Sequence, residues 1–220
     1  MVCMLGPNGC GKSTLLRTLA GLQPPLSGTY SLLGVSSDSA ATDIRHRAKQ
    51  LALVLTERLS LEHTTVHDVV AMGRYPYSSF LGGLSTEDEA IIADALQQVD
   101  LRSASDTYFN NHSDGEKQRI LIAKALAQQT PIILLDEPTA HLDLPNRIRT
   151  LQLLRHLAHE QSKTVLISTH ELDLALQLSD RILLMSSSGI QLDTPAALQS
   201  RDAFTAAFQM DIFHPLASPF

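Results

Sequence analysis

Residues that could bind phosphate stand at the start of the chain, where positions 6–13 read GPNGCGKS. This stretch fits the pattern G-x-x-x-x-G-K-[ST], in which glycines let backbone N–H groups point into a concave nest around phosphate oxygens. Lys12 would reach the outer phosphates and the Ser13 hydroxyl would bind Mg²⁺, whereas an ordinary glycine-rich turn before a helix requires neither residue at this spacing. The sequence therefore predicts a nucleoside triphosphate site, formed by Gly6, Pro7, Asn8, Gly9, Cys10, Gly11, Lys12, Ser13 and Thr14.

Two carboxylates and a histidine follow two further apolar stretches. Asp136 and Glu137 come directly after PIILL, and His170 comes directly after KTVLIST. An aspartate at the end of such a strand can hold the Mg²⁺ shell, and the neighbouring glutamate can orient or deprotonate an attacking water. The histidine can hydrogen-bond the terminal phosphate and sense its loss. The alternatives are two solvated turn carboxylates before a proline and a histidine that is structural or merely exposed.

A capped helix start is the next candidate. Ser113 and Glu116 form an S-x-x-E capping box before an apolar-striped helix. Gly115 in the first turn lowers helix stability, which indicates that something approaches the backbone closely. A capped N-terminus with a hydroxyl and exposed amides is also an anion site. Capping alone and capping combined with anion binding both remain open.

The elements that must position these residues are the strands and helices of an α/β fold. VCML, PIILL, KTVLIST and RILLMSS are continuous apolar runs, typical of parallel strands buried on both faces. Ligands in such sheets bind beyond the carboxyl ends of the strands, where the phosphate loop and the carboxylates fall. The stretch TLLRTLAG is expected to form a helix that ends at Gly21, and Asp143 is expected to cap a later helix that begins LPNR.

Composition limits the class of protein. The chain has 220 residues, of which 44% are hydrophobic and 18% charged, which predicts one large domain with a buried core. A net charge of −6 without a basic block argues against a nucleic-acid partner. No apolar run reaches membrane-spanning length, so membrane association would require another protein. Cys3 and Cys10 are expected to be free thiols in a cytosolic protein.

The stretches GPNGCGKST, SDGEKQR, ILLDEPTAHLD and STH, in this order, resemble those of the ATPase subunit of an ABC transporter. The resemblance covers nearly the whole chain. It implies an α/β P-loop NTPase of the ABC ATPase type with an inserted α-helical lobe. A single domain over 1–220 would then consist of a RecA-like core, 1–56 and 130–220, and a helical lobe, 57–129. The family's small N-terminal β-lobe is expected to be largely missing.

The resemblance also implies a role for each candidate residue. The catalytic residues would be Lys12, Glu137 and His170. The metal ligands would be Ser13, Asp136 and Glu57. The signature motif and D-loop would bind ATP through Ser113, Gly115, Glu116 and Asp143. Because the family's signature helix binds the ATP of the other subunit, a homodimer would trap two ATP molecules with Mg²⁺ between Lys12 of one chain and Ser113 of its mate.

Within the family, the chain most resembles importers of iron–siderophore, haem and cobalamin complexes. This implies an integral membrane permease as partner, a substrate-binding protein as indirect partner, and a position at the cytoplasmic face of the membrane. Tyr75, Tyr77 and Phe80 would line a groove for a permease helix or pack the lobe's own small core. A soluble ABC assembly or regulatory module and a catalytically impaired fragment are the competing hypotheses.

Three features depart from the family's pattern. Few residues precede the phosphate loop, so we expect a truncated copy, a misplaced start or a fragment that lacks the adenine-stacking aromatic. Thr56 stands where a glutamine is expected, with Glu57 beside it as a substitute ligand. Asp114 and Glu116 replace residues that are more often glycine and glutamine. As helix-capping residues they are expected to point away from phosphate.

Overall fold

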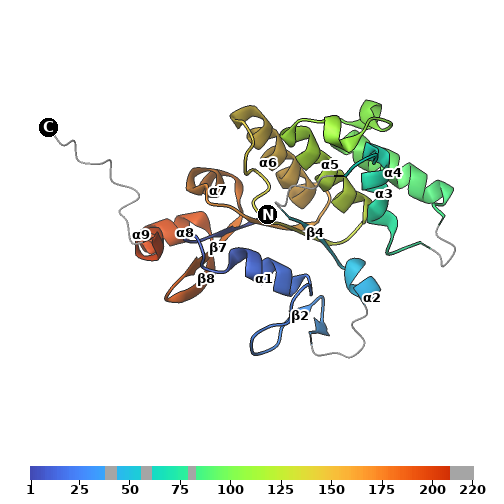
Figure 1. Cartoon of the computed structure of the whole chain (residues 1–220). Coiled ribbons are helices and arrows are strands. Elements are labelled where there is room, and N and C mark those ends of the chain that lie inside the picture. The colour runs from blue at the N-terminus through green and yellow to red at the C-terminus, as the bar shows by residue number, and fades with distance from the viewer. Residues whose placement is uncertain (38–43, 56–60, 79–82, 209–220) are drawn as a thin grey trace.

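The computed structural model describes residues 1–37, 44–55, 61–78 and 83–208. Within these ranges six strands form the main sheet, in the order β4-β5-β6-β1-β7-β8 (Figure 1). The first five strands in this order are parallel, and β8 pairs antiparallel with β7. The strands of this sheet are β1 (Val2–Leu5), β4 (Leu51–Val54), β5 (Ile132–Leu135), β6 (Thr164–Ser168), β7 (Arg181–Ser186) and β8 (Gly189–Asp193).

The predicted strands are confirmed, and two further strands complete the sheet. VCML, PIILL, KTVLIST and RILLMSS supply β1, β5, β6 and β7. The two further strands are β4, a run of only four apolar residues, and β8, whose residues are mostly exposed, and neither was predicted. Because β8 returns along β7 in a hairpin, the sheet ends in an antiparallel strand and is not parallel throughout.

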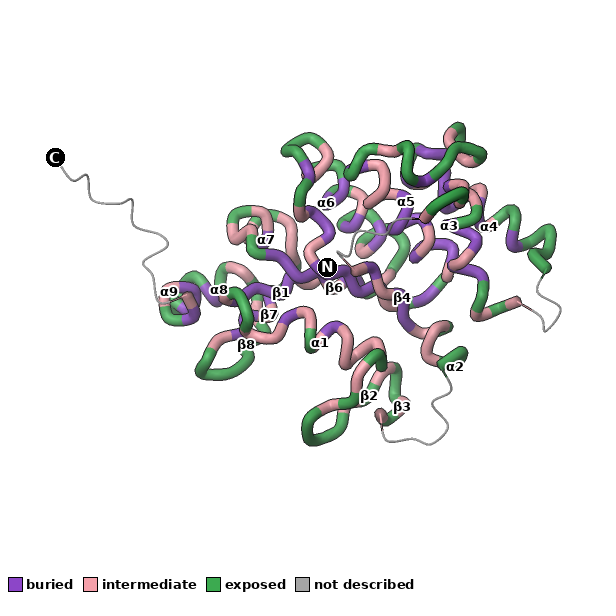
Figure 2. Tube along the Cα trace, viewed as in Figure 1, coloured by how far each residue is buried: buried purple, intermediate pink, exposed green. Residues whose placement is uncertain are grey.

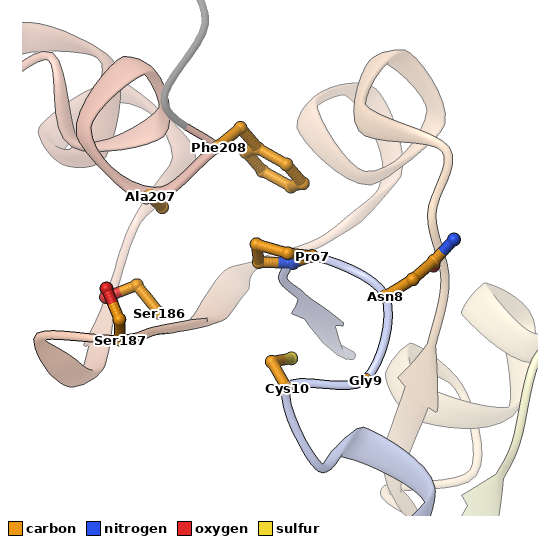
Figure 3. Close-up of a pocket in the computed structure, with 8 residues that line it drawn as sticks. All are labelled: Pro7, Asn8, Gly9, Cys10, Ser186, Ser187, Ala207 and Phe208. Carbon is orange, nitrogen blue, oxygen red and sulfur yellow. The ribbon is translucent and has the colours of Figure 1, made fainter.

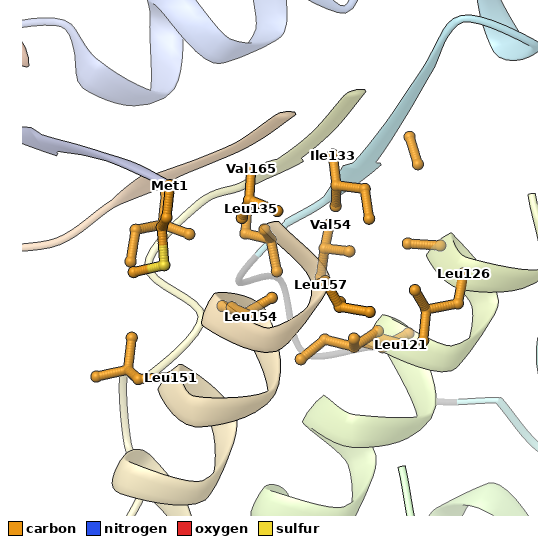
Figure 4. Packing of buried hydrophobic residues seen from close by; sticks show 14 of the residues in the cluster. Met1, Val54, Leu121, Leu126, Ile133, Leu135, Leu151, Leu154, Leu157 and Val165 are labelled. Carbon is orange, nitrogen blue, oxygen red and sulfur yellow. The ribbon is translucent and has the colours of Figure 1, made fainter. Parts of the chain in front are cut away.

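Helices cover both faces of the sheet (Figures 1 and 2). Alternate residues of β1 face opposite sides, because Cys3 and Leu5 join one buried apolar cluster and Met4 joins another. On the first side α5 and α6 pack leucines against β5 and β6, as Figure 4 shows. On the second side α1 buries Leu16 against the sheet. The strands are therefore buried on both faces, which explains their continuous apolar character.

The remaining elements surround this core. The helices are α1 (Lys12–Leu19), α2 (Ile44–Ala48), α3 (Val66–Ala71), α4 (Thr86–Gln98), α5 (Asp114–Ala127), α6 (Leu144–His159), α7 (Leu172–Leu178), α8 (Pro195–Ser200) and α9 (Ala203–Phe208). Short 3-10 turns are η1 (Met72–Arg74), η2 (Arg102–Ala104) and η3 (Phe109–Asn111). A small hairpin consists of β2 (Ser31–Leu32) and β3 (Val35–Ser36). In the described part of the chain, none of the helices has the length and hydropathy needed to cross a bilayer.

The segment between β4 and β5 is helical where the structure describes it. Helices α3 and α4 pack against α5, and a single bridge joins Thr65 to Tyr108. Helix α5 also contacts β4 and α6, so it links this segment to the sheet. The division into a core and a separate lobe at 57–129 remains a prediction.

Candidate functional site

The phosphate loop connects the end of β1 to the start of α1. Gly9 and Gly11 adopt left-handed conformations, with φ of 77° and 102°, which glycine adopts without steric cost. A Cβ at Gly6 would lie 2.5 Å from the Met185 carbonyl oxygen, so this position also requires glycine. The loop is therefore shaped by glycines at the spacing that the sequence pattern predicts.

Lys12 lies buried across this loop. Its Nζ donates hydrogen bonds to the carbonyl oxygens of Gly6 at 2.8 Å and Pro7 at 3.1 Å. As the first residue of α1, it brings a positive charge to the helix N-terminus, where the backbone dipole also favours anions. This arrangement suits the binding of phosphate groups.

A shallow hollow lies beside the loop. Figure 3 shows it between Pro7 and Cys10 on one side and Ser186, Ser187 and Phe208 on the other.

Cys3 and Cys10 are both free thiols, as predicted. Burial raises the pKa of Cys3 to about 12, so this thiol is unreactive at neutral pH.

The two candidate carboxylates are held by a serine that the sequence analysis did not single out. Ser168 Oγ donates to Asp136 Oδ1 at 2.6 Å and accepts from the backbone N–H of Glu137 at 2.8 Å. Because β5 and β6 are parallel neighbours, their carboxyl ends bring these residues together. The sequence signal for this role is that Ser168 is a polar residue at the end of the apolar stretch VLIS.

His170 lies next to Glu137 at the same edge of the sheet. Its Nδ1 is 3.7 Å from Glu137 Oε1, and its side chain is 58% exposed. Glu137 has a φ of 44°, an unusual conformation for a residue other than glycine and one that often occurs at functional sites. The structure thus brings the predicted base, histidine and metal-binding aspartate into one group.

The capping box at the start of α5 is confirmed. Glu116 accepts hydrogen bonds from the Ser113 backbone N–H at 3.0 Å and from the Ser113 hydroxyl at 2.7 Å. Both hydrogen bonds lower the pKa of Glu116, and the bond from the Ser113 hydroxyl has the larger effect. The charge of His112 lowers this pKa further by a smaller amount. The Glu116 carboxylate therefore turns back onto Ser113, as expected for a capping residue.

The close approach that Gly115 indicated comes from the chain itself. A Cβ at this position would lie 2.8 Å from Asn146 Cγ in the first turn of α6. Asp143 caps α6 by accepting a hydrogen bond from the Asn146 backbone N–H at 3.0 Å, as predicted. The glycine is thus explained by the packing of α5 against α6.

The structure does not bring all candidates together in one chain. Helices α1 and α5 lie on opposite faces of the sheet (Figure 1), so the Ser113 cap is separated from the phosphate loop. Thr56, Glu57 and Phe80 lie outside the described residues.

Two of the candidate aromatic residues can be located. Tyr75 is exposed. The hydroxyl of Tyr77 donates to the Gln128 carbonyl oxygen at 3.0 Å, and its ring lies 4.2 Å from the Arg74 guanidinium carbon. Tyr77 therefore both packs on its own chain and lines a surface groove, whose other residues are Arg45, His46, Lys49, Pro76 and Ser78.

Sequence comparison relates this chain to transport ATPases. The model of the ABC transporter family matches residues 1–140. An ABC transporter ATP-binding protein of Methanocaldococcus jannaschii is 40% identical over 85% of this chain and 64% of its own length, so this chain spans less than two thirds of that relative. The achromobactin transport ATP-binding protein of Dickeya dadantii is 35% identical over 99% of this chain and 83% of its own length. The iron(3+)-hydroxamate import ATP-binding protein of Bacillus subtilis is 36% identical over 94% of this chain and 77% of its own length.

Solved structures share the fold. A dimeric ATP-binding cassette in a post-hydrolysis state, bound to ADP and Pi, has a TM-score of 0.75 and 27% identity, over 89% of this chain and 85% of that chain. Part of an ABC transporter complex from Clostridium perfringens has a TM-score of 0.77 at 24% identity, over 93% of this chain and 81% of that chain. At this identity the likeness shows a shared fold only.

Proposed function

Because this chain belongs to the ABC transporter family, we propose that it binds and hydrolyses ATP as the motor subunit of an importer. The proposed cargo is an iron–siderophore, haem or cobalamin complex, a class supported by relatives that serve achromobactin, iron(3+)-hydroxamate and cobalamin transport. A membrane permease would carry the cargo and hold this subunit at the cytoplasmic face of the membrane. A substrate-binding protein would deliver the cargo to that permease.

The observation that carries this proposal is the group formed by Asp136, Glu137, Ser168 and His170. Ser168 fixes both the Asp136 carboxylate and the Glu137 backbone. The Glu137 side chain would accept a proton from an attacking water or orient it. His170, 3.7 Å from Glu137, would hydrogen-bond the terminal phosphate. Lys12 would neutralise the outer phosphates.

The residues present also fit a bound Mg²⁺ ion. Mg²⁺ usually takes one or two protein oxygens and completes its shell with water and phosphate oxygens. The Ser13 hydroxyl and the Asp136 carboxylate would supply those protein ligands, with Glu57 as a further proposed ligand. When bound, the ion would neutralise charge on the phosphates.

We further propose a homodimer with two shared ATP sites. Each ATP would contact Lys12 of one chain and the capped α5 start, including Ser113 and Gly115, of its mate. The separation of α1 from α5 within one chain and the dimeric form of a related cassette support this arrangement. The Ser113 hydroxyl, which donates a hydrogen bond to the Glu116 carboxylate in the free chain, would then donate it to a phosphate oxygen of that ATP.

The proposed permease contact is the groove beside Tyr77. The groove carries Arg45, His46 and Lys49, and Tyr75 is exposed nearby in sequence. Aromatic and arginine side chains often anchor protein interfaces. Co-purification of the full chain with a membrane permease tests this contact, and loss of the permease in a Tyr77→Ala variant that still binds ATP would support it.

Substitution Glu137→Gln tests the catalytic assignment. We expect ATP hydrolysis to fall at least about a hundredfold, because the amide cannot accept the proton of water. The variant should also accumulate as an ATP-bound dimer in size-exclusion chromatography. Glu160→Gln, at the exposed end of α6, is the matched control and should hydrolyse ATP at the unmodified rate. Hydrolysis by Glu137→Gln at the rate of this control would refute the role of Glu137.

A further inference from the structure

We propose that Glu171 and Arg147 form a positioning pair for ATP hydrolysis. The pair would hold the segment that carries His170 in a fixed place relative to Glu137 and the first turn of α6. The inference rests on the proposed function, because it assigns the pair to the same reaction. Neither residue was a candidate from the sequence, since they lie far apart in the chain and no local pattern links them.

The Glu171 carboxylate is held through both of its oxygens. Arg147 Nη1 donates to Oε2 at 2.9 Å, and the Thr139 hydroxyl donates to Oε1 at 3.2 Å. Arg147 Nη2 also donates to the Leu142 carbonyl oxygen at 3.2 Å. One carboxylate therefore connects the segment after His170 with two separate points of the segment that follows Glu137.

The pair is partly shielded from water. The Glu171 side chain is 13% exposed and the Arg147 side chain 32%. Arg147 Nε is buried without a hydrogen-bond partner. Charge-assisted hydrogen bonds are strong in such surroundings, and removing one partner leaves the other charge uncompensated. The pair therefore constrains the geometry more strongly than an exposed ion pair would.

The segment that begins at Glu137, to which the pair is joined at Thr139 and Leu142, is conformationally strained. Glu137 and His141 both have positive φ, 44° and 65°. Such conformations persist only where the surrounding structure enforces them. Thr139 and Leu142, the two contact points of the pair, lie within this segment. The contacts thus add, at Thr139 and Leu142, to the Ser168 hydrogen bond that holds the Glu137 backbone.

The same helix turn also reaches the start of α5. Arg147 follows Asn146, whose side chain packs against Gly115. A path of contacts therefore runs from His170 through Glu171 and Arg147 to the capped helix. In the proposed dimer these two ends serve different ATP molecules, so the pair would also link the two sites.

The test compares charge reversal with its compensation in the full chain. We expect Glu171→Arg and Arg147→Glu each to lower kcat about tenfold or more, since small misplacements of reacting groups have such effects. KM for ATP should stay within about twofold, because neither residue contacts Lys12 or the phosphate loop. The double charge-swap variant should recover at least part of the lost kcat. Arg149→Met, an exposed arginine on the same helix, is the matched control.

The outcomes separate this inference from the proposed function. Unchanged kcat in both single variants, together with loss of hydrolysis in Glu137→Gln, would overturn the pair's role and leave the function standing. Loss of kcat that follows a fall in melting temperature, without recovery in the double variant, would show a merely structural pair and also overturn the inference. Absence of hydrolysis by the unmodified chain would overturn both.

Discussion

A buried ion pair between Arg74 and Asp88 should stabilise the helical segment. Arg74 Nε donates to Asp88 Oδ1 at 2.7 Å, with side chains only 6% and 12% exposed. Asp88 Oδ2 accepts from the Ser85 backbone N–H at 2.9 Å and from its hydroxyl at 2.7 Å. Arg74 Nη1 donates to the Ala127 carbonyl oxygen at 2.8 Å. The pair thus joins η1, the start of α4 and the end of α5.

The size of this contribution follows from the pKa of Asp88. Hydrogen bonds from the Ser85 backbone, then from Arg74, lower the pKa from 3.8 to about 2. That difference corresponds to about 2.5 kcal/mol of unfolding free energy at neutral pH. Substitution Asp88→Asn also leaves the Arg74 guanidinium without its carboxylate, so we expect a loss of about 3 kcal/mol. The melting temperature should fall by about 10 °C.

The same pKa difference gives a pH dependence with a definite sign. The folded pKa lies below the unfolded one, so the contribution is complete above about pH 5 and is lost as pH falls towards 2. At pH 3 about 1 kcal/mol should already be lost. The gap in unfolding free energy between the unmodified chain and Asp88→Asn should narrow by that amount between pH 7 and pH 3.

Urea unfolding followed by circular dichroism measures this gap, since the chain has no tryptophan. Asp94→Asn, an exposed position on the same helix, is the control and should change the unfolding free energy by less than about 0.5 kcal/mol. If Asp88→Asn were as mild as this control, or if its effect did not change with pH, the reasoning from the buried pair would be wrong.

Two further substitutions probe the site and its support. Ser168→Ala removes the bonds to Asp136 and to the Glu137 backbone, so ATP hydrolysis should fall about tenfold with little change in ATP affinity; an unchanged turnover number would contradict this role. Gly115→Ala places a Cβ 2.8 Å from Asn146 Cγ and should lower the unfolding free energy by about 1–3 kcal/mol. Adding Asn146→Ala should restore part of that loss, and a failure to do so would point to another cause.

Much of the fold could be predicted because its signals are local. The glycines of the phosphate loop and the Asp143 cap act on residues a few positions away, and both are confirmed. Four apolar runs predicted four strands. The antiparallel strand β8 was missed because it is short and mostly exposed, although its apolar and polar residues alternate. Its place is set by pairing with β7 and not by its own pattern.

The site was less predictable because its supporting contacts join distant segments. Ser168 acts on the residues that follow β5, and Glu171 acts on a residue of α6. Which strand neighbours which is decided by the whole sheet, and a single sequence does not state it. Gly115 shows an intermediate case: the sequence indicated a close approach, but only the structure identifies Asn146 as the neighbour.

The central position of β1 has a consequence for synthesis. Its two neighbours in the sheet, β6 and β7, end at residues 168 and 186. A growing chain on the ribosome therefore carries its phosphate loop without both flanking strands until residue 186 has been synthesised. Because Gly6 packs against Met185 of β7, we expect a chain that stops before this strand to leave its phosphate loop without that support.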